Sequence, residues 1–269
     1  MVELDNETLR KLQMTELELL KVVDNLCRKN KINYSLDGGT LLGAVRHKGF
    51  IPWDDDADVM MSRKEYDRFF EVCKTQLNLE QYFLQEFRTD EQYRWGYSKL
   101  RKNGTVFLRE GQEHIKCHTG VCIDIFVFDN VPIGYLNQRL SLLKCFLIRK
   151  GLYSVVGKKS SEKLFLRFYY FLMSFFPREF WVKKLNKLIQ NNNSKPAQLM
   201  SHLTYPNPPK VRYGLSKHYF DEYIEMEFEK CTFMVIKNYD KYFTELFGDY
   251  MKLPSKDKQK THPVSKIEL

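Results

Sequence analysis

The 269-residue sequence has no long uninterrupted hydrophobic run. A helix that crosses a membrane needs about 20 predominantly apolar residues. The most apolar stretch, residues 165–176, is broken by Arg167 and followed by Pro177. The first twelve residues are charged from position three onward and contain no apolar run. We therefore expect neither a membrane-spanning helix nor a signal or transit peptide.

Cysteine is also sparse, with six residues scattered along the chain and no Cys-x-x-Cys pair. In a chain without an export signal, we expect these thiols to be reduced and mostly to fill the core. The arrangement closest to a metal-binding pattern is His114, Cys117, His118 and Cys122. It lacks the paired spacing of a zinc site, so we expect no zinc there.

Acidic residues are scarce in one region of an otherwise ordinary composition. Hydrophobic residues make up 43% of the chain and charged residues 29%, which excludes a wholly disordered protein. The net charge is +9, but residues 1–134 carry −3 and residues 135–269 carry +12. Between residues 135 and 220, sixteen basic residues accompany only Glu162 and Glu179. This asymmetry predicts that the middle of the chain faces negative charge.

The hydrophobic periodicity predicts an α+β fold. Apolar residues recur at helical spacing over residues 5–30, 40–46 and 63–77. Strands are expected over residues 32–36, 57–61, 82–87, 95–100, 105–109 and 121–128. We expect the strands over 82–87, 95–100 and 105–109 to belong to one sheet.

The composition changes near residue 136, which suggests three parts. We expect a catalytic core over residues 1–134, a basic, aromatic helical insertion over 135–216, and a C-terminal helical segment over 217–269 that completes the catalytic domain. The insertion should be helical over residues 138–190 and end in a loop over 191–209. The C-terminal part should include a helix over residues 238–253.

Two interpretations of the basic, aromatic helices stay open. Apolar aromatic residues flanked by Lys and Arg suit the edge of an anionic bilayer. The same pattern also fits a buried helical hairpin whose basic face is solvated. The excess of basic residues favours the membrane surface.

A glycine turn, Gly38-Gly39-Thr40, stands at the predicted start of a helix. Glycine lets the backbone approach a phosphate, and the free N–H groups at a helix start attract anions. Most such triplets are simple turns, so a second sequence feature is needed before this one indicates a binding site.

The second feature is a run of carboxylates just downstream, Asp54-Asp55-Asp56-Ala57-Asp58. Alternate side chains of an extended segment point the same way, which places Asp56 and Asp58 on one face. Their oxygen ligands suit Mg²⁺ or Mn²⁺ rather than zinc. Asp124 interrupts an apolar strand, where a lone buried charge is costly unless it is paired or bound to metal. Together these residues predict a phosphoryl-transfer site, with a solvated acidic turn and a surface-facing Asp124 as the structural alternatives.

The run from Asp37 to Asp58 closely resembles the signature of the LicD family, nucleotidyltransferase-fold enzymes related to the fukutin-type sugar-phosphate transferases. The likeness continues over residues 99–105 and 123–126 and returns at Tyr239 and over 247–254. It implies a nucleotidyltransferase-like mixed sheet flanked by helices. The basic segment lies outside these motifs.

The resemblance implies transfer of phosphocholine from CDP-choline to a sugar hydroxyl of a cell-surface glycan precursor, with release of CMP. The expected donor is CDP-choline. The expected acceptor is a lipid-linked glycan precursor, of the teichoic acid or the lipopolysaccharide type. The third expected partner is the surface of an anionic membrane. We therefore expect a cytoplasmic protein that is peripheral at the inner face of the membrane.

Our hypothesis for the mechanism gives the catalytic and metal-binding roles to three carboxylates. Asp56 and Asp58 would hold Mg²⁺ (or Mn²⁺) on the diphosphate, and Asp124 would share the metal and help to deprotonate the acceptor hydroxyl. The residues expected to contact the donor phosphates are Gly39, Thr40, Arg46, Lys99 and Arg101. A quaternary ammonium is recognised by aromatic faces, and the nearest candidates are Trp53, Trp95 and Tyr97.

Other functions compete with this one. A polyol-phosphate transferase using CDP-ribitol or CDP-glycerol would differ only in its donor pocket. A strict nucleotidyltransferase would use the same carboxylates but release pyrophosphate, which the extended signature disfavours. A nucleic-acid-binding protein would fit the basic, aromatic composition. The sequence contains no RNA-recognition or zinc-finger motif, however, so we expect no nucleic acid.

Overall fold

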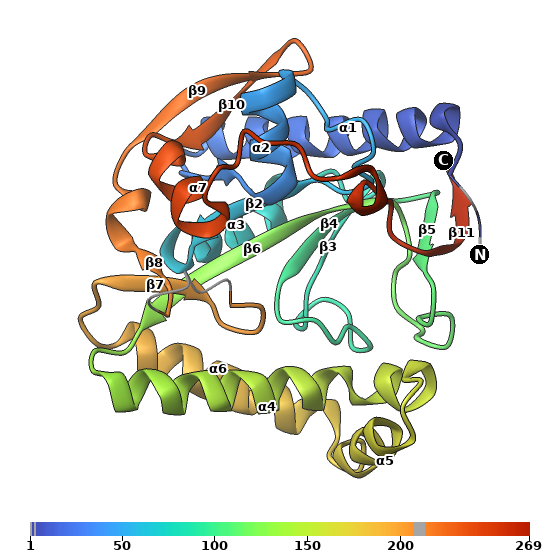
Figure 1. Cartoon of the computed structure of the whole chain (residues 1–269), viewed down its shortest axis with the longest axis vertical. Coiled ribbons are helices and arrows are strands. Elements are labelled where there is room, and N and C mark those ends of the chain that lie inside the picture. The colour runs from blue at the N-terminus through green and yellow to red at the C-terminus, as the bar shows by residue number, and fades with distance from the viewer. Residues whose placement is uncertain (1, 3, 207–212) are drawn as a thin grey trace.

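The computed structural model describes residues 2, 4–206 and 213–269. A curled mixed β-sheet crosses the middle of the molecule (Figure 1). Its main strands lie in the order β1 (Ser35–Leu36), β2 (Asp58–Ser62), β6 (Cys122–Val131), β4 (Ser98–Lys102) and β3 (Tyr82–Gln85). β2 and β6 are parallel, whereas the other neighbours are antiparallel. The predicted α+β fold with a mixed sheet is confirmed.

Three helices in the first part of the chain form where the sequence predicted them. They are α1 (Asn6–Lys29), α2 (Gly38–His47) and α3 (Arg63–Gln76). α1 starts after Asp5, whose Oδ1 accepts the Thr8 N–H at 2.7 Å and caps the helix. Leu12, Leu19 and Val23 on α1 are fully buried in the core, as their helical spacing requires.

The strand over residues 105–109 forms, but it does not join the central sheet as predicted. β5 (Val106–Arg109) pairs instead with the last strand, β11 (Val264–Glu268). The sequence predicted helices and no strand in this part of the chain, because the apolar alternation over residues 264–268 is short. The pairing brings the C-terminal residues beside the first half of the chain, near the N-terminus (Figure 1).

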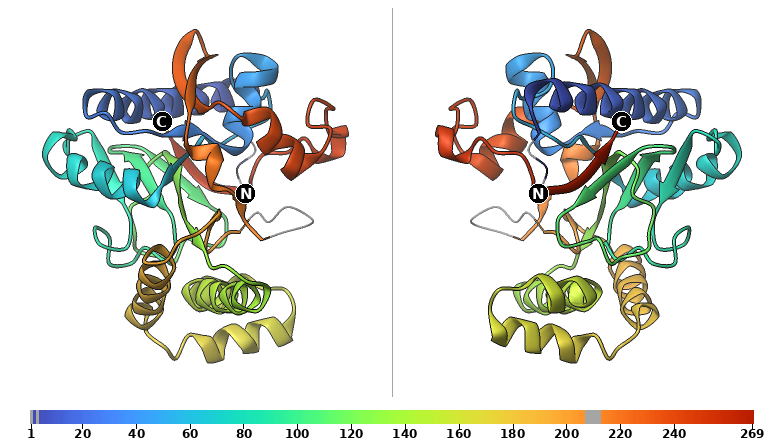
Figure 2. Two further views of the ribbon diagram at one scale, coloured as in Figure 1. Left: turned by 90° about the vertical axis from the view of Figure 1, so that its left-hand side faces the viewer. Right: turned by 90° about the vertical axis from the view of Figure 1, so that its right-hand side faces the viewer.

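The C-terminal segment contains strands where helices were expected. β9 (Tyr223–Phe228) and β10 (Cys231–Ile236) form a hairpin that projects from the molecule (Figure 2). Its two turn residues, Glu229 and Lys230, both have positive φ, as the tight turns of twisted hairpins require. The alternation of apolar and acidic residues over 224–228 is a strand signal that the helical prediction missed.

The remaining elements after residue 193 are short. α7 (Tyr239–Phe247) ends earlier than predicted, at Gly248, which has φ 74°. Two 3₁₀ turns are η1 (Lys217–Phe220) and η2 (Lys256–Lys258). The predicted loop over 191–209 instead contains β7 (Leu199–His202), which pairs with the second half of β6, and β8 (Leu215–Ser216) pairs with β7. Residues 207–209 of that loop lie outside the described residues.

The predicted basic, aromatic helices form a separate layer at one end of the molecule (Figures 1 and 2). They are α4 (Tyr135–Ser160), α5 (Leu164–Met173) and α6 (Arg178–Asn193). The layer has its own small core, which includes Cys145, Leu152, Trp181 and Leu185. Within the described part of the chain, none of the helices has the length and apolar character needed to span a bilayer.

Gly151 lets Trp181 pack closely against α4. A Cβ at position 151 would lie 2.1 Å from the Trp181 ring. We expect Gly151→Ala to lower the free energy of unfolding by about 1–3 kcal/mol, because this overpacking outweighs the better helix propensity of Ala. Lys159→Ala, at an exposed position of the same helix, should change it by less than about 0.5 kcal/mol. Urea denaturation of both variants measures the difference, and an equally stable Gly151→Ala protein would contradict this packing.

Candidate active site

The parallel pairing of β2 with β6 brings two of the predicted carboxylates together. Asp58 and Asp124 are register partners, and the Asp124 N–H donates to the Ala57 carbonyl at 2.8 Å. Neighbouring strands lie about 4.8 Å apart, and paired residues point to the same face. Ile123 and Ile125 point into the core, so Asp124 between them points out of it. Two residues 66 positions apart in the sequence therefore share one face of the sheet.

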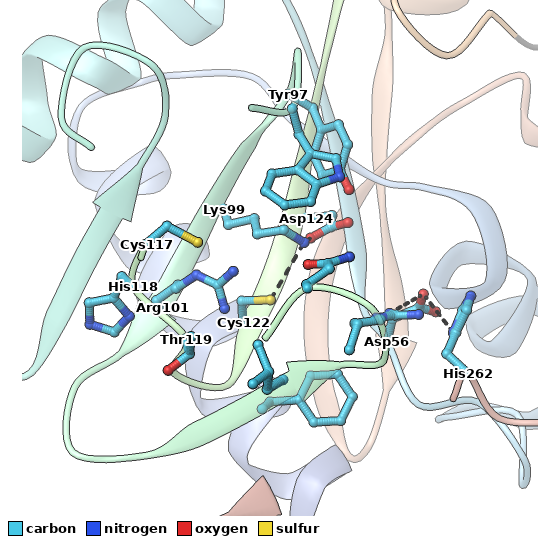
Figure 3. A pocket seen from close by; sticks show the side chains of 15 residues that line it. Asp56, Tyr97, Lys99, Arg101, Cys117, His118, Thr119, Cys122, Asp124 and His262 are labelled. Carbon is cyan, nitrogen blue, oxygen red and sulfur yellow. Dashed lines mark hydrogen bonds and ion pairs between the residues drawn. The ribbon is translucent and has the colours of Figure 1, made fainter. Parts of the chain in front are cut away.

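Lys99 neutralises the charge of Asp124. The two residues are opposite each other in the antiparallel pair of β4 and β6, and the Lys99 ammonium forms an ion pair with Asp124 Oδ1 (Figure 3). Lys99 Nζ also lies 3.6 Å from Cys122 Sγ and 5.0 Å from the centre of the Tyr97 ring. Both side chains of the ion pair are only 12% exposed. The sequence predicted a buried Asp124 but did not predict that Lys99 is its partner.

Asp56 lies at the other end of the same region, between two basic groups. Its Oδ2 accepts from Arg109 Nη2 at 3.3 Å and lies 3.6 Å from His262 Nδ1 (Figure 3). Asp55, which is buried, accepts the His262 backbone N–H at 3.0 Å, and its Oδ1 lies 2.9 Å from His262 Nδ1. The pairing of β5 with β11 thus positions both Arg109 and His262.

Negative charge exceeds positive charge around Asp58. Burial, together with the neighbouring charges of Asp56 and Asp124, raises the pKa of Asp58 well above its usual range. Burial and the charges of Asp56 and Asp55 raise the pKa of Asp54 to about 7. No ion pair reaches Asp58 from residues 2, 4–206 or 213–269. A cation at this position would relieve the repulsion.

The carboxylates at this site fit a divalent cation, since hard oxygen ligands are what Mg²⁺ and Mn²⁺ prefer. In the described part of the chain, the group of ligand atoms that come within 4.8 Å of one another belongs to Asp55, Asp56 and His262. This set differs from the predicted trio of Asp56, Asp58 and Asp124, because the chain turns Asp56 toward His262 and Lys99 holds Asp124. The structure therefore brings together an acidic group that could hold a metal ion, and its members are not the predicted three carboxylates.

The glycine turn makes room for these carboxylates. A Cβ on Gly39 would lie 2.5 Å from Asp54 Oδ2, and one on Gly38, which has φ 50°, would lie 2.9 Å from Asp58 Oδ2. The Thr40 hydroxyl accepts the Asp58 N–H at 2.8 Å and is buried. In this structure the glycines permit a close approach of the protein's own acidic side chains, and the predicted phosphate contacts of Gly39 and Thr40 stay predictions.

A pocket of about 240 Å³ opens beside Asp124 (Figure 3). Its walls come from β4, β5, the start of β6 and the loop between β5 and β6. Three basic side chains, Lys99, Arg101 and Arg109, share it with two carboxylates, Asp56 and Asp124. The other lining residues are Trp95, Tyr97, Phe107, Leu108, Gln112, Cys117, His118, Thr119, Cys122 and His262. Such a pocket can receive a phosphate next to an apolar or cationic group.

The structure sorts the predicted contact residues into two groups. Lys99, Arg101, Trp95 and Tyr97 line the pocket together with Asp56 and Asp124. Gly39, Thr40, Arg46, Trp53 and Asp58 do not line it. Arg101 donates to the Gln85 side chain and the Gly120 carbonyl, so the fold already uses much of its hydrogen-bonding capacity. The sequence could not reveal these bonds because both acceptors are distant in the chain.

Arg46 holds the C-terminal segment. Its Nη1 donates to the Tyr250 carbonyl at 3.2 Å, and the Tyr250 hydroxyl donates to Asp240 at 2.6 Å. The ring of Tyr250 packs on Phe243. Tyr250 therefore ties the segment that follows α7 to this helix, within the motif at residues 247–254.

Sequence reasoning missed Arg109 and His262 as candidate site residues. Arg109 was assigned to the end of a predicted strand, and His262 to the C-terminal segment that was expected to be helical. Neither has a local pattern that marks it, because the pairing of β5 with β11 creates their position. Three residues of the arrangement compared with a zinc site, Cys117, His118 and Cys122, line the pocket.

His202 supports the aromatic wall behind Tyr97. Its ring lies 6.0 Å from that of Tyr97, and its Nδ1 accepts the Tyr205 N–H at 3.0 Å, which requires a neutral imidazole. Burial lowers the pKa of His202 to about 4. As the pH falls from about 6.5 toward 4, the unfolded chain gains a proton at this residue and the folded chain does not, so stability is lost.

We therefore expect wild type to lose about 3 kcal/mol more of its free energy of unfolding than His202→Asn between pH 7 and pH 4. Asn retains an acceptor for the Tyr205 N–H but does not titrate. Urea denaturation at several pH values measures the difference between the two proteins. Parallel pH profiles would show that His202 does not stay neutral in the folded state.

Comparison with known proteins identifies the family of this chain. The family model described as "LicD/FKTN/FKRP, nucleotidyltransferase domain" matches residues 31–135, which contain the glycine turn, the carboxylates and the pocket-lining strands. The chain is also 34% identical over 277 residues to the lipopolysaccharide cholinephosphotransferase LicD of Haemophilus influenzae, covering 96% of each protein. The chain belongs to the LicD family, as its motifs predicted.

Shorter matches involve uncharacterized proteins of two Rickettsia species. One, from Rickettsia prowazekii, is 36% identical over 76 residues, which cover 21% of this chain and 29% of that protein. The other, from Rickettsia typhi, is 44% identical over 55 residues, which cover 20% of this chain and 18% of that protein. These matches add no information about activity.

Proposed function

We propose that this protein transfers phosphocholine from CDP-choline to a sugar hydroxyl of a cell-surface glycan precursor and releases CMP. The observation that carries the proposal is the pocket in which Lys99, Arg101 and Arg109 lie beside clustered carboxylates. The similarity to the Haemophilus cholinephosphotransferase over nearly the whole chain supports the choice of reaction.

The residues of the pocket suit the two ends of the transferred group. Lys99 and Arg109 provide positive charge for the diphosphate oxygens, and the guanidinium of Arg109 can contact them through two N–H groups. Trp95 and Tyr97 provide aromatic faces, which attract a quaternary ammonium that cannot donate an N–H hydrogen bond. Trp53 is less suited to this role because it does not line the pocket.

Asp56, Asp58 and Asp124 would hold Mg²⁺ or Mn²⁺, with Asp55 and His262 orienting Asp56. A bound divalent ion would supply positive charge against the negative charge that develops on the phosphates. The protein groups then have defined tasks. Lys99 pairs with Asp124 and orients its carboxylate, which can accept a proton from the acceptor hydroxyl.

In the proposed step, the oxygen of the acceptor hydroxyl attacks the choline-bearing phosphorus. A new oxygen–phosphorus bond forms, and the bond between that phosphorus and the bridging oxygen breaks, so that CMP leaves with the electron pair. The hydroxyl proton passes to Asp124. Arg109 stabilises the charge that grows on the departing phosphate.

For the acceptor we propose a lipid-linked precursor of the lipopolysaccharide or teichoic acid type. The name of the Haemophilus relative supports the lipopolysaccharide type. Such an acceptor would place the protein in the cytoplasm, peripheral at the inner face of the membrane.

A thermal-shift experiment tests the donor. Wild type, Asp58→Ala and the control Asp257→Asn, which changes an exposed carboxylate outside the pocket, are melted with Mg²⁺ and with CDP-choline, CDP-ribitol, CDP-glycerol or CTP. A ligand at about 100 times its Kd stabilises a protein by roughly 2.7 kcal/mol. We expect CDP-choline to raise the Tm of wild type and Asp257→Asn, and Asp58→Ala to lose the metal-dependent part of the increase.

The other outcomes redirect or reject the proposal. A Tm increase with CDP-ribitol or CDP-glycerol alone would make the protein a polyol-phosphate transferase with the same chemistry. An increase with CTP alone would indicate a strict nucleotidyltransferase. No increase with any nucleotide would contradict a nucleotide-donor site.

A further inference from the structure

An extensive apolar surface covers the helical layer. Fifteen of the twenty-three large hydrophobic side chains that are exposed among the described residues fall between residues 133 and 176. Monomeric soluble proteins rarely expose contiguous apolar patches larger than a few hundred Å², and larger ones mark interaction surfaces. This concentration needs a partner that excludes water.

On α4 the exposed residues form a stripe. Leu136, Leu140, Leu143 and Leu147 follow one another at helical spacing and are 39–70% exposed. The opposite side of α4 holds the small core of the layer through Cys145, Ile148 and Leu152. The leucine stripe therefore faces away from the protein's own packing.

α5 continues this apolar surface. Leu164, Phe168, Phe171 and Phe175 recur at the same spacing and are 48–78% exposed, and Phe165 beside them is 77% exposed. Tyr170 is the fully packed residue of this helix; its ring rests on α4 where Gly157 leaves space. One anchoring residue leaves the remaining aromatic face of α5 uncovered.

A groove joins the two apolar faces. It has a volume of about 540 Å³, and Leu147, Met173 and Phe176 form part of its apolar wall. Three lysines, Lys144, Lys184 and Lys187, stand around it. An apolar floor with ammonium groups around it matches the layered structure of a membrane surface, where acyl chains lie below anionic headgroups.

The net charge of the helical layer distinguishes between two possible partners, a second copy of the chain and an anionic bilayer. Residues 135–193 contain twelve basic and two acidic residues. Pairing this face with a second copy would bring two strongly positive surfaces together, which is unfavourable. An anionic bilayer satisfies both the apolar side chains and the charge.

We propose that the layer formed by α4, α5 and α6 docks onto an anionic lipid bilayer. The leucine stripe of α4 and the phenylalanines of α5 enter the boundary between headgroups and acyl chains, and Lys144, Lys184 and Lys187 contact lipid phosphates. The inference does not depend on the proposed reaction, because a protein without transferase activity would still bind vesicles through this layer.

Vesicle sedimentation with the full chain tests the proposal. Wild type should bind vesicles of 70% phosphatidylcholine and 30% phosphatidylglycerol at least tenfold more tightly than pure phosphatidylcholine, and salt should weaken the binding. Phe165→Ser/Phe168→Ser should bind at least tenfold more weakly, since two exposed rings can no longer enter the lipid. Lys184→Gln/Lys187→Gln should lose about 30-fold, or about fivefold for each lysine.

Two controls match these variants outside the layer. Leu79→Ser changes an apolar side chain that is 63% exposed, and Lys21→Gln/Lys29→Gln removes two exposed charges from α1, which lies at the opposite end of the molecule (Figure 1). Both should bind vesicles within about twofold of wild type.

Three results would overturn the inference: no binding to either vesicle, equal binding by all variants, or a lipid-free dimer that Phe165→Ser/Phe168→Ser converts to a monomer. The last result would assign the face to a second copy of the chain. If one of these results is obtained while CDP-choline still raises the Tm of the protein, only the docking inference has failed and the proposed reaction is unaffected.

Discussion

Replacing Asp58 with Asn is expected to reduce phosphocholine transfer by about 10³-fold without destabilising the fold. The substitution removes a carboxylate that would hold the divalent ion, and loss of a group that stabilises transition-state charge costs a factor of this size. Asp58 is also repelled by Asp56 and Asp124, which raise its pKa together with burial. A neutral amide removes this repulsion, so the free energy of unfolding at pH 7 should stay the same or increase.

The measurement combines CMP release from CDP-choline with urea denaturation, using Asp257→Asn as the exposed control. The control should keep both activity and stability. An active Asp58→Asn protein would exclude Asp58 from the site. A protein that is both inactive and much less stable would show that Asp58 serves the fold rather than the reaction.

The second large effect is expected at the ion pair between Lys99 and Asp124. Lys99→Met leaves the buried Asp124 charge without its cation, and breaking a buried pair on one side costs about 3–5 kcal/mol. The same change removes a positive charge from the pocket, so transfer should also fall by at least about 10²-fold.

A double variant separates the two effects. Lys99→Met/Asp124→Asn removes both charges, so it should recover most of the stability lost by Lys99→Met but none of the activity. Denaturation curves and initial rates of the single and double variants complete the cycle. If Lys99→Met unfolds like wild type, the pair is not a buried interaction of this size.

Much of the fold was predictable because its signals are local. The buried residues of α1 recur every three or four positions, and the apolar run around Asp124 is short and rich in Val, Ile and Phe, which favours a strand. The hairpin β9–β10 was missed although its alternation is also local, because acidic residues between the apolar ones resemble an exposed helix face. β11 was missed because its partner strand, β5, lies about 155 residues away in the chain.

The candidate site was only partly predictable for the same reason. Asp56, Asp58 and Asp124 could be selected from the sequence alone. Carboxylates clustered beside a glycine turn repel one another, and a lone carboxylate in an apolar strand is costly to bury without a partner. Nothing in the sequence around Arg109 or His262 marks either residue in this way. Their role follows from a strand pairing that the sequence pattern does not encode locally.

The sequence by itself determined the family, the α+β class and the basic, aromatic middle region, and it singled out three carboxylates as candidates, because each depends on residue type and short-range spacing. Tertiary structure decided which groups neutralise one another. It paired Lys99 with Asp124 and brought His262 to Asp55. It also placed Asp54 and Asp58 against the two glycines of the turn, and it left one face of the helical layer exposed. Charge neutralisation and burial depend on distances between remote segments, and those distances exist only once the chain has folded.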